Sequence, residues 1–264
     1  MPNVKFLYEG IEGATLTASG GTSAGYNIED VKDRNPNTLW VSSTQDLTQT
    51  FKAILPASRN VDTIIIDGIN GSALGINSGF TLKIKSSPNG TVWTDRYTFN
   101  AAAVNGKTRL VCEIASANAQ QWMLEFNDTD TSLAAAPQIG SILLGTRFEP
   151  ATPYDEIPKH GEQFTTTFSR ALDSTPYGSQ NINDGIEIWK NIQWQRVTGA
   201  TRLAFLTMGH TCRGKLRPLY FIDVDGTSYL VYLPDKIEEQ HVMYDQYTIS
   251  LELEAFSPGT IKLT

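Results

Sequence analysis

Short apolar or alternating stretches recur along this chain of 264 residues, and turn residues separate them. Alternation of apolar and polar residues indicates a half-buried strand, because successive side chains of a strand point to opposite faces. Before residue 149 such stretches span residues 14–18, 38–42, 47–54, 61–67, 80–86, 92–99, 108–114, 121–126 and 139–148. This spacing predicts an antiparallel sandwich or barrel, in which only residues 28–33 suit a short helical turn.

Three prolines, Pro150, Pro153 and Pro158, interrupt this pattern. Proline removes a backbone donor and biases the residue before it toward extended conformations. The chain length also suits two domains of ordinary size. We therefore predict a first domain over 1–150 and a second over 151–264, joined by a Pro-rich linker at 149–161.

The second part has a different pattern. Residues 163–170, 187–196 and 246–256 read as strands, and residues 199–209 suit an amphipathic helix. Two further strands, 219–224 and 228–233, flank Asp225-Gly226, which is a strong hairpin signal. The turn also explains the carboxylate pair Asp223 and Asp225 without invoking chemistry. A polar loop from Asp173 to Gly185 completes a mainly β domain, a sandwich or barrel with one helix.

The charge balance excludes a nucleic-acid reader. The formal net charge is −7, whereas proteins that bind phosphate backbones usually carry a basic stripe. The densest basic cluster is Arg213, Lys215 and Arg217, beside Pro218. We interpret this cluster as a solvated turn.

Catalytic and metal-binding motifs are missing from the sequence. It contains no nucleophile elbow, phosphate-binding loop, dinucleotide fingerprint or His-Glu-x-x-His. His210 and Cys212 lack partners for a zinc site, and Cys112 is distant in the sequence. Two reduced thiols in the cytosol and a single disulfide remain the alternatives. We expect no enzyme, although a glycosidase, which needs only two carboxylates, would escape this search.

The N-terminus lacks the basic and apolar segments of a secretory signal. The longest apolar runs, such as Ile64-Ile65-Ile66, are too short to span a bilayer. We therefore expect a soluble protein made in the cytosol, with no membrane segment.

Two Trp-bearing segments carry a family resemblance. Turn residues and oxygen donors lead into the first Trp, and an Asn-Gly turn precedes the second. The matching positions are Asp33, Asn35, Thr38 and Trp40, and then Ser87, Asn89, Gly90 and Trp93. Residues 121–126 and 139–145 follow in order, and the set resembles the discoidin-type, or coagulation-factor type C, galactose-binding-like domain over about residues 14–148. Arg34 and Asn89 depart from the Gly and Asp of the family motifs. The resemblance implies a jelly-roll β-sandwich.

The resemblance also implies ligand sites. In the family the early loop often holds a structural calcium, which here implies Asp33, Asn35 and Thr38 as ligands. Calcium takes six to eight oxygens, and Ser141 stands where the family has a late Glu. In the family, glycans bind loops at one end of the sandwich, and the resemblance implies Tyr26, Arg34 and Trp40 as the candidates here. Two alternatives stay open, because the loop also suits a purely structural role and Trp40 also suits the core.

The second part, over about residues 160–258, resembles tail-tube or distal-tail modules of long-tailed bacteriophages. The resemblance rests on element order, on Arg217-Pro218 before an aromatic strand, and on the closing alternating strand. It implies a ring of identical copies that contacts tube, hub and tape-measure proteins. The candidates for an inter-subunit arm lie in the polar loop: Asp173, Tyr177, Asn181 and Asp184.

The leading hypothesis is a structural component of a bacteriophage tail tip or baseplate, similar to a distal tail protein. It would belong to the virion tail and assemble in the host cytoplasm. The alternatives are a carbohydrate-binding protein for host recognition, and an accessory module of a polysaccharide-degrading enzyme.

Overall fold

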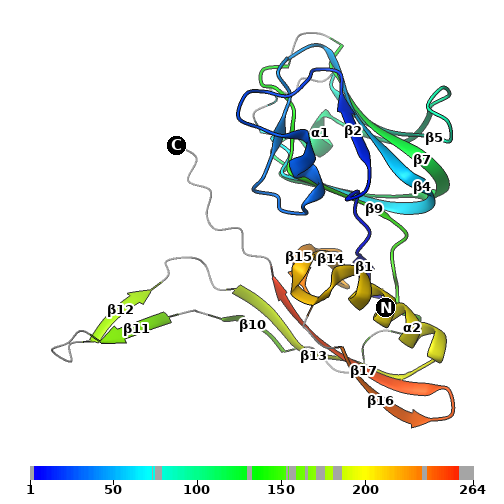
Figure 1. Cartoon of the computed structure of the whole chain (residues 1–264), viewed down its shortest axis with the longest axis vertical. Coiled ribbons are helices and arrows are strands. Elements are labelled where there is room, and N and C mark those ends of the chain that lie inside the picture. Colours follow the sequence, from blue (N-terminus) through cyan, green and yellow to red (C-terminus); the bar gives the residue numbers. More distant parts are fainter. Residues whose placement is uncertain are drawn as a thin grey trace. The chain divides into compact units, whose positions relative to one another are not determined.

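The computed structural model describes residues 3–72, 74, 79–129, 133–152, 154, 159–163, 166–170, 176–180, 186–233 and 237–255. The chain divides into two compact units (Figure 1). One is Leu7–Arg147, and the other combines Met1–Phe6 with Phe148–Thr264. Both are built mainly from strands, so the predicted mainly β fold class is confirmed.

The Leu7–Arg147 unit is a β-sandwich. Its largest sheet has six strands, of which five follow one another and β9 (Ser141–Gly145) pairs separately with β4. The five are, in order, β2 (Thr15–Ala18), β4 (Thr48–Asp67), β7 (Arg109–Asn127), β5 (Thr81–Ser87) and β6 (Thr94–Asn100). A small second sheet pairs β3 (Trp40–Val41) with β8 (Gln138–Ile139).

Strands β4 and β7 each join two strands that the sequence predicts as separate. The predicted strands 47–54 and 61–67 are one continuous element, and so are 108–114 and 121–126. The two strands pair along both halves, with a register shift between Ile54 and Arg59. Such irregularities bend a strand, and β9 pairs only with the second half of β4, from Thr63 to Asp67. One sheet thereby contributes to both layers, and Figure 1 shows both long strands as curved arrows.

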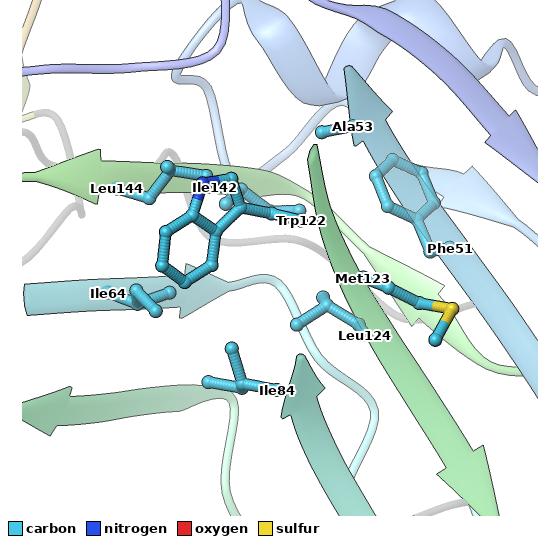
Figure 2. A pocket seen from close by; sticks show the side chains of 9 residues that line it. All are labelled: Phe51, Ala53, Ile64, Ile84, Trp122, Met123, Leu124, Ile142 and Leu144. Carbon is cyan, nitrogen blue, oxygen red and sulfur yellow. The ribbon is translucent and has the colours of Figure 1, made fainter. Parts of the chain in front are cut away.

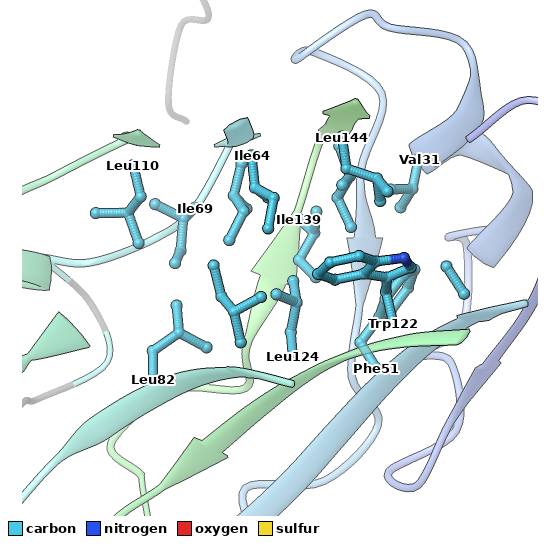
Figure 3. Close-up of a cluster of buried hydrophobic side chains, with 14 of the residues drawn as sticks. Val31, Phe51, Ile64, Ile69, Leu82, Leu110, Trp122, Leu124, Ile139 and Leu144 are labelled. Carbon is cyan, nitrogen blue, oxygen red and sulfur yellow. The ribbon is translucent and has the colours of Figure 1, made fainter. Parts of the chain in front are cut away.

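Apolar side chains from both layers meet in the interior (Figure 3). Trp40, Trp122 and Phe51 are among them, and each is buried. The predicted helical turn is confirmed as η1 (Ile28–Lys32), which adds Val31 to this core. Asn27 caps η1 by accepting a hydrogen bond from the Glu29 amide at 3.0 Å. A second short helix, α1 (Ala101–Val104), is capped in the same way by Asn100.

The other unit is organised around a seven-stranded sheet. Six strands follow one another, and β16 (Glu238–Met243) pairs with β17 beside them. The six are β1 (Lys5–Leu7), β14 (Leu219–Ile222), β15 (Ser228–Tyr232), β17 (Gln246–Ala255), β13 (Ile186–Val197) and β10 (Lys159–Gln163). The first strand of the chain thus lies next to β14. The predicted first domain, 1–150, therefore differs from the structure, which places Met1–Phe6 in the other unit. A strand of three residues is too short for the sequence to indicate which strand it pairs with.

One helix covers this sheet. The predicted helix 199–209 is confirmed as α2 (Gly199–Cys212), which extends three residues further. Thr198 caps its start, and Arg213 ends it in the left-handed conformation at φ 52°. The buried ring of Phe205 lies 4.8 Å from that of Trp194 on β13, measured between centroids. The short helix η2 (Gly214–Leu216) follows.

The predicted hairpin at Asp225-Gly226 is confirmed, since β14 and β15 pair antiparallel and Gly226 adopts φ +86°. The predicted polar loop 173–185 is corrected, because β12 (Pro176–Gln180) within it pairs with β11 (Thr166–Arg170). Tyr177 of β12 lies opposite Ser169. Asp173, Asn181 and Asp184 lie outside the described residues.

Cys112 and Cys212 are buried and form no disulfide, which leaves the two reduced thiols of the sequence-based alternatives. Among the described residues, no helix combines the length and apolar character needed to cross a membrane.

Candidate ligand-binding surface

The loop before Trp40 brings Asp33, Asn35 and Thr38 together. One carboxylate oxygen of Asp33 accepts a hydrogen bond from the Asn35 amide at 2.7 Å. The other accepts from the Thr38 hydroxyl, also at 2.7 Å. The Asn35 side chain in turn accepts from the Asn37 amide at 3.0 Å. The three residues therefore close the loop by hydrogen bonds to one another.

The side-chain oxygens of these three residues take part in hydrogen bonds within the loop. Calcium needs six to eight oxygens, whereas this loop offers one carboxylate, and both of its oxygens already accept hydrogen bonds. Ser141, at the position of the family's late Glu, is fully buried, and its hydroxyl has no hydrogen-bond partner in the structure. Within the described ranges, no three His, Cys, Asp or Glu side chains gather into a metal-binding group. The loop fits a self-contained turn, and calcium binding stays an untested prediction.

Arg34 is part of the interior rather than of an exposed surface. Its side chain is only 2% exposed and forms an ion pair with Glu12. Its backbone has φ 61°, a conformation that glycine adopts most readily. A glycine, as in the motif that the sequence resembles, would adopt this conformation without strain. With its guanidinium buried and paired, Arg34 is not placed to contact a glycan.

Trp40 is also buried, with 1% of its surface exposed, which supports the core alternative of the sequence analysis. Its ring lies 5.0 Å from that of Phe51, between centroids. Its indole N–H lies 3.2 Å from two acceptors, the Gly21 carbonyl and the Thr22 hydroxyl. Trp40 therefore fastens the loop 19–27 to the core instead of facing a ligand.

Tyr26 lies on that fastened loop and is 47% exposed. The Ser23 amide donates to the Val41 carbonyl at 2.9 Å, and the Tyr26 amide donates to the Ser23 carbonyl at 3.2 Å. The backbone around Tyr26 is thus tied to strand β3 on one side and to the capped helix η1 on the other. Of the three glycan candidates, Tyr26 alone presents an exposed ring.

A second loop, which the sequence analysis did not single out, lies beside the first. The Ser43 amide donates to the Gly20 carbonyl at 3.2 Å, and the Leu133 amide donates to the Gln45 carbonyl at 3.1 Å. We define the loop surface as five exposed residues of the two loops: Thr22, Tyr26, Ser43, Gln45 and Asp46. It combines an aromatic ring with hydroxyl, amide and carboxylate groups. The amide and the hydroxyl of Ser43 both donate to the Gly20 carbonyl and so join the two loops, and no sequence motif marks this contact.

The second Trp motif forms a turn between β5 and β6. The Ser87 hydroxyl accepts from the Gly90 amide at 2.9 Å, and Gly90 adopts φ +80°. Trp93 is half-buried, and the Lys52 ammonium lies 5.7 Å from the centre of its ring. The motif therefore accounts for a hairpin and a cation–π contact, and neither points to a ligand.

The interior holds a small apolar cavity of about 20 Å³, shown in Figure 2. It is lined by Phe51, Ala53, Ile64, Ile84, Trp122, Met123, Leu124, Ile142 and Leu144. This volume is about that of one water molecule, and almost every lining group is apolar. The cavity is a packing gap in the core and cannot hold a sugar.

No family model matches the chain, and no curated protein matches it. Similar solved structures include the following three. CpGH89CBM32-5 from Clostridium perfringens, in complex with GalNAc-β-1,3-galactose, is 14% identical over 53% of this chain and 99% of that chain, with a TM-score of 0.43. Chitosan-binding module 2 of a Paenibacillus sp. IK-5 chitosanase/glucanase, in complex with chitotriose, is 16% identical over 51% and 97%, with a TM-score of 0.42. CBM32-3 from a family 31 glycoside hydrolase of Clostridium perfringens is 18% identical over 52% and 96%, with a TM-score of 0.39.

These likenesses have TM-scores of 0.43 or less and identities of 18% or less. At this level they identify neither a family nor a ligand for this chain. None of the three is a phage tail protein, so the predicted tail role gains no support from them.

Proposed function

We propose that the chain is a non-catalytic carbohydrate-binding protein and that it binds its glycan on the loop surface. The observation that carries the proposal is the exposed ring of Tyr26 on a loop fastened to the core by Trp40. This takes up the alternative hypothesis of the sequence analysis rather than the leading one.

Sugars present C–H groups on the faces of their rings and hydroxyls around the rim. An exposed tyrosine supplies a flat apolar face with a polar tip, at low conformational cost. Ser43, Gln45 and Asp46 supply hydrogen-bonding groups on the neighbouring loop. Because backbone hydrogen bonds hold both loops in place, little ordering is needed when a ligand binds.

The test is a glycan array that spans neutral, amino- and acidic saccharides, followed by calorimetric titration of the best binder. Replacing Tyr26 with Ala should weaken binding by about tenfold or more, since aromatic anchors dominate such contacts. The matched control is Tyr97→Ala, because Tyr97 is 39% exposed on β6 and does not belong to the loop surface.

Equal loss of affinity in the Tyr26 and Tyr97 variants would place the ligand elsewhere and refute the site. Failure of the full-length protein to bind any saccharide on the array would refute the function. Release of reducing ends from a polysaccharide would contradict the non-catalytic part of the proposal.

A structural component of a bacteriophage tail tip is the second candidate, with the virion tail as its location and the host cytoplasm as the place of assembly. The observation in its favour is the β11–β12 hairpin, which pairs with no other strand in the described part of the chain. An isolated two-stranded hairpin is marginally stable, so it suits an arm that another subunit supports. Negative-stain images of rings or tail fragments would favour this candidate, and a monomer at all concentrations would speak against it.

A further inference from the structure

The two loops that carry the loop surface contain no basic residue. Lys and Arg are absent from residues 13–31 and 35–51, which include both loops. They are also absent from residues 110–146, where the Asp128 and Leu133 amides donate hydrogen bonds to the second loop. A saccharide with carboxylate or sulfate groups would therefore find no cation on these loops to bind its charge.

The basic residues that border these loops in the sequence already have other contacts. Lys32 forms an ion pair with Glu29, and the buried Arg34 forms one with Glu12. The next basic residue, Lys52, lies over an aromatic ring. These three cations are thus engaged with groups outside the loop surface.

Each loop also supplies a carboxylate. In the second loop Asp46 is exposed, and one of its carboxylate oxygens accepts a hydrogen bond from the Thr44 hydroxyl at 2.8 Å. After the first loop, Asp30 is half-buried in the first turn of η1, four residues beyond Tyr26. None of the ion pairs in the described part of the chain involves Asp30 or Asp46. The charge on this surface is therefore negative.

The exposed ring of Tyr26 favours the same kind of ligand. The face of an aromatic ring is electron-rich, so it attracts a cation as well as the apolar face of a sugar. A ring and two carboxylates without a neighbouring cation are complementary to a sugar that carries positive charge.

We propose that the loop surface binds an amino-saccharide, that is, an oligosaccharide whose sugars carry free, protonated amines. A sugar ring lies on Tyr26, and ammonium groups of the same oligomer lie near Asp46 and Asp30. Because Tyr26 and Asp46 belong to different loops, an oligomer suits the surface better than a single sugar. This inference rests on the proposed function, since it names the ligand class of the same surface.

The test is calorimetric titration with three oligosaccharides of the same length, made of glucosamine, N-acetylglucosamine and glucuronic acid. Slightly acidic buffer keeps the amines protonated while aspartates stay ionised. The glucosamine oligomer should bind about tenfold more tightly than its acetylated form, and the acidic oligomer should bind most weakly. Added salt should weaken only the binding of the glucosamine oligomer, because salt screens exposed charges.

Two substitutions test the charge directly. Asp46→Asn removes the charge and keeps an acceptor for the Thr44 hydroxyl. It should weaken binding of the glucosamine oligomer by about threefold to fivefold, the effect of one exposed charge pair, and leave the acetylated form unaffected. Gln45→Lys places a cation on the loop surface and should also weaken it. The matched control is Asp95→Asn, which removes one charge from β6, where Asp95 is 48% exposed, and should change neither affinity.

The outcomes separate this inference from the proposed function. Equal affinity for the glucosamine and N-acetylglucosamine oligomers would overturn the inference and leave glycan binding intact. Equal effects of Asp46→Asn and Asp95→Asn would do the same. A lysine peptide that binds as tightly as the glucosamine oligomer would also overturn it, because the surface would then recognise ammonium groups without a sugar. Binding to no saccharide at all would refute the proposed function itself.

Discussion

The apolar face of the main β-sheet is covered in different ways in the two units. In Leu7–Arg147 the long strands β4 and β7 bend over, so both sides of the main core are supplied by strands. In the other unit, α2 covers one face, where Trp194, Ile192 and Phe205 are buried. Along β13 and β17 the opposite face is polar, and Gln193 there donates to the Ser250 hydroxyl at 3.2 Å.

The two units therefore expose different kinds of surface. In Leu7–Arg147 the loop surface lies on exposed loops that connect the strands of the sandwich. In the other unit every residue of β16 is exposed, and so is Tyr244 at the end of that strand. Exposed strand edges and apolar patches are features that monomers usually avoid.

The largest effect should come from removing one tryptophan from each core. Trp40→Ala should destabilise Leu7–Arg147 by about 3–5 kcal/mol, the usual cost of deleting a large buried aromatic side chain. Trp194→Ala should destabilise the other unit by a similar amount, because Trp194 is fully buried there. Scanning calorimetry of the full chain should resolve two transitions, and each variant should lower only one of them. If either substitution lowers both transitions equally, the two units unfold as one and the comparison fails.

Much of this fold could be predicted from local pattern. The strands, the capped turn 28–33, helix α2 and the Asp-Gly hairpin each depend on neighbouring residues, and the sequence shows those neighbours. Long-range pairing could not be predicted in the same way. Nothing near Lys5–Leu7 indicates that this strand joins β14, and the polar composition of 173–185 hides β12. The predicted strands 47–54 and 61–67 were separate, whereas the structure has one continuous strand, β4, that includes Pro56.

The ion pairs of the two units should also differ in how much they contribute to the free energy of unfolding. Arg34 is buried, so Glu12→Gln leaves a guanidinium in the core without its carboxylate partner. Burial also lowers the pKa of Arg59, which Glu9 and Glu12 oppose, so Glu12 supports two cations. The expected loss of stability is on the order of 2 kcal/mol, measured by urea unfolding of the Leu7–Arg147 transition.

The comparison pair is Arg202 and Glu239, which lies at the surface of the other unit. Glu239→Gln should change unfolding much less, because water screens an exposed pair. A larger loss of stability in Glu239→Gln than in Glu12→Gln would show that burial does not determine how much these two ion pairs stabilise the fold.

The candidate site was harder to predict than the fold. Asp33, Asn35 and Thr38 do gather as their spacing suggests, since all three lie within one turn. The motif could not show that Arg34 and Trp40 are buried, because burial depends on Glu12 and Phe51, which are distant in the sequence. Ser43 and Gln45 were missed because the hydrogen bonds from Ser43 to the Gly20 carbonyl join two loops that are distant in the sequence.

A smaller effect should distinguish the units at alkaline pH. Burial raises the pKa of the Cys112 thiol from about 9 to about 12. Between these values the unfolded chain loses this proton while the folded unit keeps it, so stability falls as pH rises. Below pH 9 both states are protonated, and the thiol adds no pH dependence. The expected slope is about 1.4 kcal/mol per pH unit above pH 9 in the Leu7–Arg147 transition. Cys112→Ala should remove it, and Cys212→Ala should not, because Cys212 lies in the other unit. An unchanged slope in Cys112→Ala would mean that other groups cause the alkaline loss.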